Sequence, residues 1–246
     1  MTVRSEADEP VSIVDSEAVS SLTSALLSVA EPERASRMRA YMKDRFEFLG
    51  VPSPERRRAA APFIASFKGA GQDRLLHAAA VLWTMPQREY AYVAADLLRR
   101  YERVLSPAAL GPLQTLVTTD SWWDGVDALA HVVGAVVRAH TEAADVMDAW
   151  AGDDDLWVVR VAIIHQLGWK ADAEPERIFG YCVEQAAHRD FFVRKAIGWA
   201  LRDLARTYPD DVRSFVAAHS DVLSPLSVRE ATKHLAQQAI GVGPSF

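Results

Sequence analysis

The sequence contains only one cysteine, Cys182, among its 246 residues. This excludes an intramolecular disulfide and any metal site built from several cysteines, and it fits a reducing intracellular compartment. Long apolar runs are also missing, since no stretch approaches the ~18 residues that a membrane-spanning helix needs. The acidic N-terminus has the opposite charge to a secretory signal. We therefore expect a cytoplasmic protein without a membrane partner.

Several kinds of reactive site are absent as well. The seven histidines never occur at the i, i+4 spacing of a zinc-binding helix. A glycine-rich phosphate loop and a serine-centred nucleophile elbow are also missing. Nothing in the sequence requires a metal ion or an organic cofactor, so we expect neither.

The charge of the chain is unevenly distributed. The formal net charge is −6, but residues 1–17 hold five acids against one base, and the remainder has 28 acids and 26 bases. Residues 1–15 are acidic and lack an apolar pattern, which is typical of a disordered leader. We expect one domain over residues 16–240, with a core supplied by the half of all residues that is apolar, and a short tail over 241–246.

The apolar pattern is helical almost throughout. From Val19 onward, apolar residues recur at spacings of three and four, and short Pro, Gly and Asp clusters separate the segments. No segment alternates in the manner of a strand. The pattern predicts an all-α fold.

A period of 35 residues runs through these helical segments. Asp120, Asp155 and Asp190 are spaced by 35, and an aromatic residue follows each of them two positions later. The same step relates VRKA at 193–196 to VREA at 228–231. Helical repeats of this length are typical of a curved α-solenoid of stacked helix pairs. Its concave face is lined by the same helix of successive repeats, so residues distant in sequence would meet there.

The stretch SWWDGVD lies at the start of one such helix. Ser121 and Asp124 match a capping box, which predicts a helix beginning at Trp122. The core-facing stripe of that helix would be Trp122, Val126, Leu129 and Val133. Trp123 and Asp127 lie four residues apart on another face. They form either the amphipathic rim of a packed helix or a functional pair of indole and carboxylate.

Basic residues recur at one phase of several repeats. Arg160 stands inside an apolar run, where its guanidinium must find an anion or water. In the helix that follows, one face carries Lys195, Trp199, Arg202 and Arg206. Residues 34–58 hold eight bases against three acids. Each Arg taken alone could lie on a solvated helix face, but together these residues suit a phosphate backbone.

Five segments together carry a family resemblance. In order they are RMRAYMKDRFEFLGVPSPERRR, SWWDGVD, LWVVRVAIIHQL, DFFVRKAIGWALRD and LSPLSVREATKHL. From about Met38 to Leu235 the sequence resembles the AlkD family of DNA alkylation-repair glycosylases. The resemblance implies HEAT-like repeats and a monofunctional glycosylase that removes cationic N3- and N7-alkylated purines from duplex DNA. It also implies that the base stays largely in the duplex while the protein holds backbone and sugar.

The resemblance also implies roles for individual residues. Asp127 matches the catalytic carboxylate of the family, and Trp123 and Trp199 match its two active-site tryptophans. The implied DNA contacts are Arg160, Lys195, Arg202, Arg206, Tyr41 and Ser53. The sequence departs from the pattern at Pro52 and Ser53, where relatives have Gln-Thr. A polar contact of the first position is lost there, which affects lesion preference rather than the chemistry.

The chemistry follows from charge. A cationic purine leaves as a neutral base, so no general acid is needed, and one carboxylate can both stabilise the oxocarbenium-like sugar and position water. The two indoles would add cation–π attraction to the same sugar cation. No lysine is placed to form a Schiff base, so lyase activity is not expected. The alternative is a non-catalytic repeat scaffold that binds DNA or a protein. For either function we expect a monomer.

Overall fold

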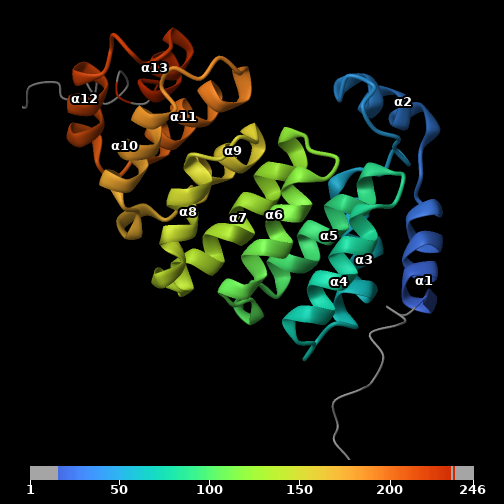
Figure 1. Ribbon diagram of the computed structural model, residues 1–246. Helices are drawn as coiled ribbons and strands as arrows, with labels where there is room; N and C mark the ends of the chain where they lie inside the picture. Colours follow the sequence, from blue (N-terminus) through green and yellow to red (C-terminus); the bar gives the residue numbers. More distant parts are fainter. Residues whose placement is uncertain (1–15, 234, 236–246) are drawn as a thin grey trace, which may run out of the picture. The chain divides into compact units, whose positions relative to one another are not determined.

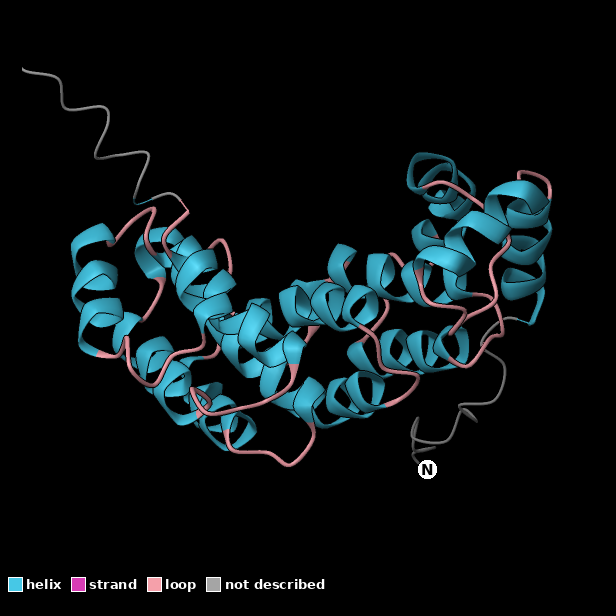
Figure 2. Ribbon diagram, turned by 90° about the horizontal axis from the view of Figure 1, so that it is seen from above, coloured by secondary structure: helices cyan, strands magenta, loops and turns pink. Residues whose placement is uncertain are grey.

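The computed structural model describes residues 16–233 and residue 235. These residues form thirteen α-helices and four short 3-10 helices, and their only β contact is an isolated bridge between Glu47 and Gln87. Figure 2 shows helices joined by loops, without strands, in this part of the chain. The predicted all-α fold is confirmed. The expected leader at 1–15 and tail at 241–246 lie outside the described residues.

The chain divides into two compact units between Val104 and Leu105. The single domain expected over 16–240 therefore stays a prediction. Helices of the first unit are α1 (Ser16–Leu27), α2 (Pro32–Tyr41), α3 (Ser53–Ala65), α4 (Gln72–Trp83), α5 (Arg88–Arg100) and the 3-10 turn η1 (Glu102–Val104). In this unit α1 and α5 both pack on α3, and α4 packs on α5. The core is aliphatic, with fully buried leucines on α1, α4 and α5.

A buried carboxylate fixes the loop that leads into α3. Glu89 has no exposed surface, and it accepts hydrogen bonds from the backbone N–H groups of Leu49, Gly50 and Val51 at 3.0, 2.9 and 3.1 Å. Gly50 has a φ of +83°, and a Cβ at this position would lie 2.1 Å from the carbonyl oxygen of Glu31. Only glycine fits this backbone. The start of α3, where Ser53 lies, is thereby held in place.

The second unit contains η2 (Pro107–Ala109), α6 (Leu110–Thr118), α7 (Trp123–Ala139), η3 (Thr141–Ala143), α8 (Ala144–Ala151), α9 (Leu156–Ile164), η4 (Lys170–Asp172), α10 (Pro175–Glu184), α11 (Phe191–Leu204), α12 (Pro209–Ala218) and α13 (Pro225–Ala231). Its repeats stack through one series of helices. Helix α9 packs against both α7 and α11, and α11 packs against α13 (Figure 1). The side chains of α7 that face the neighbouring helices include the predicted core residues Val126, Leu129 and Val133.

Two of the three periodic aspartates cap the helices that follow them. The Asp155 carboxylate accepts from the N–H of Trp157 at 2.7 Å, and that of Asp190 accepts from the N–H of Phe192 at 2.6 Å. These bonds satisfy backbone donors that a helix N-terminus leaves open. The period in the sequence therefore marks real helix starts at α9 and α11.

The capping box expected at Ser121 is wrong. Helix α7 begins at Trp123, one residue later than predicted, and its N-cap Trp122 gives no side-chain cap. The Ser121 hydroxyl instead donates to the carbonyl oxygen of Val117 at 2.7 Å, and Asp120 adopts a left-handed φ of 46°. Ser121 therefore lies one residue before the N-cap of α7, and its hydroxyl bonds back to the preceding helix rather than capping the first turn of α7.

The three periodic aromatic residues meet in space. Ring centroids of Trp122 and Trp157 are 5.8 Å apart, and Phe192 lies 4.9 Å from each of them. These tilted and edge-on arrangements are favourable for aromatic rings. The N-terminal ends of α7, α9 and α11 are therefore held together by one residue from each repeat.

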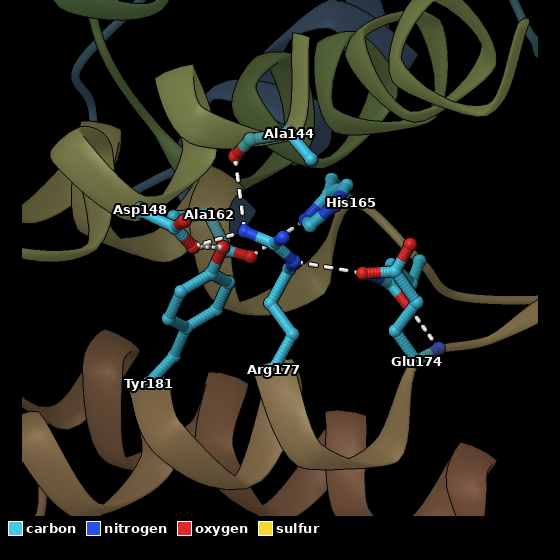
Figure 3. Close-up of polar contacts among 8 residues, drawn as sticks. Ala144, Asp148, Ala162, His165, Glu174, Arg177 and Tyr181 are labelled. Atoms are coloured by element: carbon cyan, nitrogen blue, oxygen red, sulfur yellow. Dashed lines mark hydrogen bonds and ion pairs between the residues drawn. The ribbon is translucent and has the colours of Figure 1, made fainter. Parts of the chain in front are cut away.

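A polar cluster joins α8 to α10 on another part of this unit (Figure 3). Arg177 of α10 pairs with Asp148 and donates to Glu174 at 2.7 Å, while the Tyr181 hydroxyl donates to Asp148 at 2.6 Å. His165 is buried beside them, and burial lowers its pKa to about 4. A neutral His165 then donates from Nδ1 to the Ala162 carbonyl at 2.7 Å. This cluster is part of the packing between repeats.

Within residues 16–233, no helix is both long and apolar enough to cross a membrane.

Candidate functional site

Asp127 and Arg160 form a bidentate ion pair between α7 and α9. Nε of Arg160 donates to Oδ1 of Asp127 at 2.7 Å, and Nη2 donates to Oδ2 at 2.9 Å. Nη1 donates to the carbonyl oxygen of Phe192 on α11 at 2.6 Å. The Arg160 side chain is 3% exposed and that of Asp127 is 17% exposed. The carboxylate is thus fixed in direction yet still reached by solvent.

The pair has a regular origin in the fold. Asp127, Arg160 and Lys195 are each the fifth residue of their helices, α7, α9 and α11. Successive helices of the stack therefore place their charged side chains at the same height. Arg160 stands in an apolar run and needs an anion as partner. That partner is the carboxylate of Asp127 in the preceding repeat.

Burial and pairing act on Asp127 in opposite directions. Desolvation is the larger effect and raises the pKa of the Asp127 carboxyl, while the hydrogen bonds and charge of Arg160 lower it. The net pKa lies above the ordinary value of an aspartate. Burial therefore disfavours the charged form of Asp127, and Arg160 partly offsets this cost.

Two indoles border this pair. Trp123 lies one turn before Asp127 on α7, so the two side chains share a helix face. Trp199 of α11 has its ring centroid 5.8 Å from Cζ of Arg160. Both rings are partly exposed. The structure brings Asp127, Arg160 and Trp199 together, with Trp123 on the same helix as the carboxylate.

The basic residues of α11 have partners of their own. Nζ of Lys195 lies 2.8 Å from one oxygen of Glu230, and Nη1 of Arg202 lies 3.0 Å from the other. Arg206 lies two residues after the end of α11, is more exposed, at 64%, and is 3.7 Å from Asp203. Of the predicted stripe, Lys195, Trp199 and Arg202 lie on α11, and the two cations among them share one buried carboxylate.

Two further predicted DNA contacts, Tyr41 and Ser53, belong to the first unit. Tyr41, the last residue of α2, is 68% exposed, and Ser53 is exposed at the first residue of α3. Their roles as DNA contacts stay predictions. The same holds for Arg160, whose three donating nitrogens are directed at Asp127 and Phe192.

Glu230 is the functional candidate that reading the sequence missed. It lies 35 residues after Lys195, which lies 35 residues after Arg160, so the repeat itself relates all three. The carbonyl of Phe192 was also missed, because a backbone acceptor leaves no trace in residue type. Among residues 16–233, no group of three or more His, Cys, Asp or Glu side chains could hold a metal ion.

Solved structures of other proteins share this fold. A solved structure described as a predicted DNA alkylation repair enzyme from Enterococcus faecalis is 31% identical, with a TM-score of 0.79, and the match covers 85% of this chain and 97% of that one. AlkD2 from Streptococcus mutans is 17% identical with a TM-score of 0.58, covering 81% and 98%. The protein smu.31 from Streptococcus mutans UA159 is 16% identical with a TM-score of 0.56, covering 82% and 97%. At these lower identities the likeness shows the fold alone.

No curated protein matches the sequence. The model of one protein family, described as DNA alkylation repair enzyme, matches residues 22–235. The match spans nearly all of the described chain. It includes Asp127 and Arg160 of the ion pair and the basic residues that follow them, Lys195, Arg202 and Arg206. The chain therefore belongs to the DNA alkylation repair enzyme family.

Proposed function

We propose that the protein is a monofunctional DNA glycosylase that hydrolyses the N-glycosidic bond of cationic N3- and N7-alkylated purines in duplex DNA. The observation that carries the proposal is the carboxylate of Asp127, which is 17% exposed, fixed by Arg160 and bordered by Trp123 and Trp199. A solvent-accessible carboxylate would repel the phosphates on a surface used only to bind them, because like charges repel. A carboxylate beside indoles suits a sugar that becomes positive.

The roles of the residues follow from the charges that form during the reaction. As the bond from C1′ to the cationic purine breaks, positive charge moves from the base to the sugar, and the base leaves neutral. Asp127 stabilises the sugar cation and accepts a hydrogen bond from the attacking water, since a carboxylate has about four acceptor sites and Arg160 occupies two of them. Trp123 and Trp199 offer their ring faces to the same cation.

Specificity then depends on the leaving group. Without a general acid, a neutral purine cannot be expelled, so unmodified and neutral lesions are poor substrates. The cations of α11 supply phosphate contacts that hold the sugar beside Asp127, and proximity of this kind contributes strongly to rate. A Schiff-base lysine is not part of the proposal, so the product is an abasic site with an intact strand.

The test is release of free base from duplex DNA treated with a methylating agent. The native protein should release N3-methyladenine or N7-methylguanine, and Asp127→Asn should lower the single-turnover rate by about 10²–10³-fold, as for loss of a preorganised electrostatic contact. Asp145→Asn makes the same charge change at an exposed position of α8 and should release base like the native protein.

Binding must be measured in parallel. Asp127→Asn leaves Arg160 buried without its anion, so circular dichroism must show that the variant is folded at the assay temperature. Retained duplex affinity with lost base release supports an enzyme with Asp127 at its centre. If the native protein binds duplex but releases no base above the spontaneous rate, the enzyme is refuted and a DNA-binding scaffold remains.

A further inference from the structure

Three cations converge on one buried carboxylate where α11 meets α13. Oε1 of Glu230 lies 2.8 Å from Nζ of Lys195 and 2.6 Å from Nζ of Lys233. Oε2 lies 3.0 Å from Nη1 of Arg202. The side chain of Glu230 is only 4% exposed. A carboxylate buried to this degree is stable only when charged donors satisfy it, and here three of them do.

Two of the cations lie on either side of Trp199. Lys195 is one turn before this tryptophan on α11, and Arg202 is one turn after it, so all three share a helix face. Glu230 binds both through opposite oxygens. The carboxylate therefore fixes the two cations relative to each other and to the indole between them.

A glycine makes this arrangement sterically possible. A Cβ added to Gly198 would lie 2.4 Å from Cβ of Glu230 and 2.9 Å from the carbonyl oxygen of Ser227. The hydroxyl of Ser227 in turn donates to the carbonyl oxygen of Arg194 at 2.9 Å. Helix α13 thus reaches α11 at the residue next to Trp199, which places Glu230 under the basic face.

The cluster keeps a surplus of positive charge that solvent can reach. Three cations against one carboxylate leave a net charge of +2, and the side chains of Lys195, Arg202 and Lys233 are 31%, 20% and 47% exposed. Burial acts to raise the pKa of Glu230, but hydrogen bonds from Lys195 and Lys233 outweigh it and bring the pKa to about 2. Glu230 is therefore ionised at neutral pH.

We propose that Glu230 is a positioning residue of the DNA-binding face, which holds Lys195 and Arg202 on either side of Trp199 as phosphate contacts and brings Lys233 beside them as a third. This inference rests on the proposed function, in that the phosphates are those of duplex DNA. Glu230 itself does not contact DNA. It sets the direction of the groups that do.

The test compares Glu230→Gln with Glu176→Gln, which removes the same charge from an exposed position of α10. In the first variant the three cations lose their shared counter-charge and repel one another. Affinity for undamaged duplex, measured by fluorescence anisotropy between low and moderate salt, should then show a log–log slope steeper by about one, as expected for about one more counterion released. Single-turnover base release should slow by about tenfold. Glu176→Gln should change neither quantity.

Lys233→Gln provides a second variant that leaves the buried carboxylate paired with Lys195 and Arg202. Its salt slope should become shallower by about one phosphate contact. If Glu230→Gln does not fold, this variant decides alone, and an unchanged slope overturns the proposal. Equal salt slopes of duplex affinity for Glu230→Gln and Glu176→Gln also overturn it. So does a loss of affinity and rate in Glu230→Gln that only matches the unfolded fraction seen by circular dichroism. Binding to undamaged duplex is measured without catalysis, so it tests Glu230 even if the native protein releases no base.

Discussion

Arg160 determines how much of the charge of Asp127 survives burial. Without its guanidinium, the carboxylate would face the full cost of desolvation, which is the largest effect on its pKa. The bidentate geometry, at 2.7 and 2.9 Å, also prevents the carboxylate from rotating. A single arginine thus sets both the protonation and the direction of the residue on which the proposed chemistry depends.

This leads to a prediction about pH. In the proposed mechanism base release requires ionised Asp127. Burial raises the pKa of this group, so the rate should fall with decreasing pH at a higher pH than an ordinary aspartate would give. Arg160→Gln removes the groups that lower the pKa, so the acid limb should move to still higher pH. A single-turnover rate profile from pH 5 to 9 measures both. Arg213→Gln removes the exposed ion-pair partner of Asp210 and serves as the control. If the rate falls at the same acidic pH in the native protein and in Arg160→Gln, Arg160 does not set the pKa of Asp127.

At the scale of elements, the 35-residue repeat is seen at the starts of helices, where Asp155 and Asp190 cap α9 and α11. Asp155 accepts from two backbone N–H groups at the start of α9, the helix that carries Arg160. The neighbouring Asp154 is exposed and makes no such cap. The two residues therefore separate the effect of the cap from the effect of a local negative charge.

Asp155→Ala should lower the free energy of unfolding by about 1 kcal/mol, the usual contribution of an N-cap. For a chain of this size, that corresponds to a fall in the unfolding midpoint of roughly 2–4 °C. Thermal denaturation followed by circular dichroism checks this, with Asp154→Ala expected to stay close to the native midpoint. Equal shifts for the two variants would show that the charge, not the cap, stabilises the helix.

The periodicity of the sequence predicted helix positions. It predicted the contacts between side chains of different helices only in part. The 35-residue step located the starts of α9 and α11 because Asp155 and Asp190 cap them. The same logic failed at Ser121, where the hydroxyl bonds back to α6. An arginine inside an apolar run must find an anion, but only the stacked helices show that the anion is Asp127.

The basic residues of α11 show the same limit. Lys195 and Arg202 were predicted as surface cations, and nothing in the residue types of α11 shows that they bind an internal carboxylate. That contact depends on how closely α13 approaches, which Gly198 allows. Helix propensity and spacing describe one helix at a time, whereas the contact of Lys195 and Arg202 with Glu230 depends on how two helices pack.

At the scale of the molecule, the two units differ in charge. The first unit, residues 1–104, carries 15 bases and 14 acids, whereas residues 105–246 carry 12 bases and 19 acids. The unit that contains Asp127 is therefore acidic as a whole, and its cations are gathered on particular faces. We therefore expect long-range attraction to a polyanion to come from the first unit rather than from the acidic second unit, because net charge governs steering at distance.

Neutralising the first unit should therefore change association more than chemistry. The double variant Arg37→Gln/Arg57→Gln removes two exposed charges and should weaken duplex affinity at low salt by about tenfold or more. The log–log salt slope should become shallower by up to about two. Single-turnover base release at saturating protein should stay near the native rate. Stopped-flow association and base release measure the two, with Arg213→Gln as the control, and an unchanged association rate would refute steering by the first unit.

The contact from Arg160 to both Asp127 and the carbonyl of Phe192 has a consequence for how such a sequence can change over generations. One buried guanidinium joins three successive repeats, so losing either partner of the pair leaves a charge stranded at a cost of about 3–5 kcal/mol. That is a large part of the net stability of a typical domain. Change at this position must therefore pass through a less stable protein, and the carboxylate and the guanidinium are expected to persist together or to disappear together.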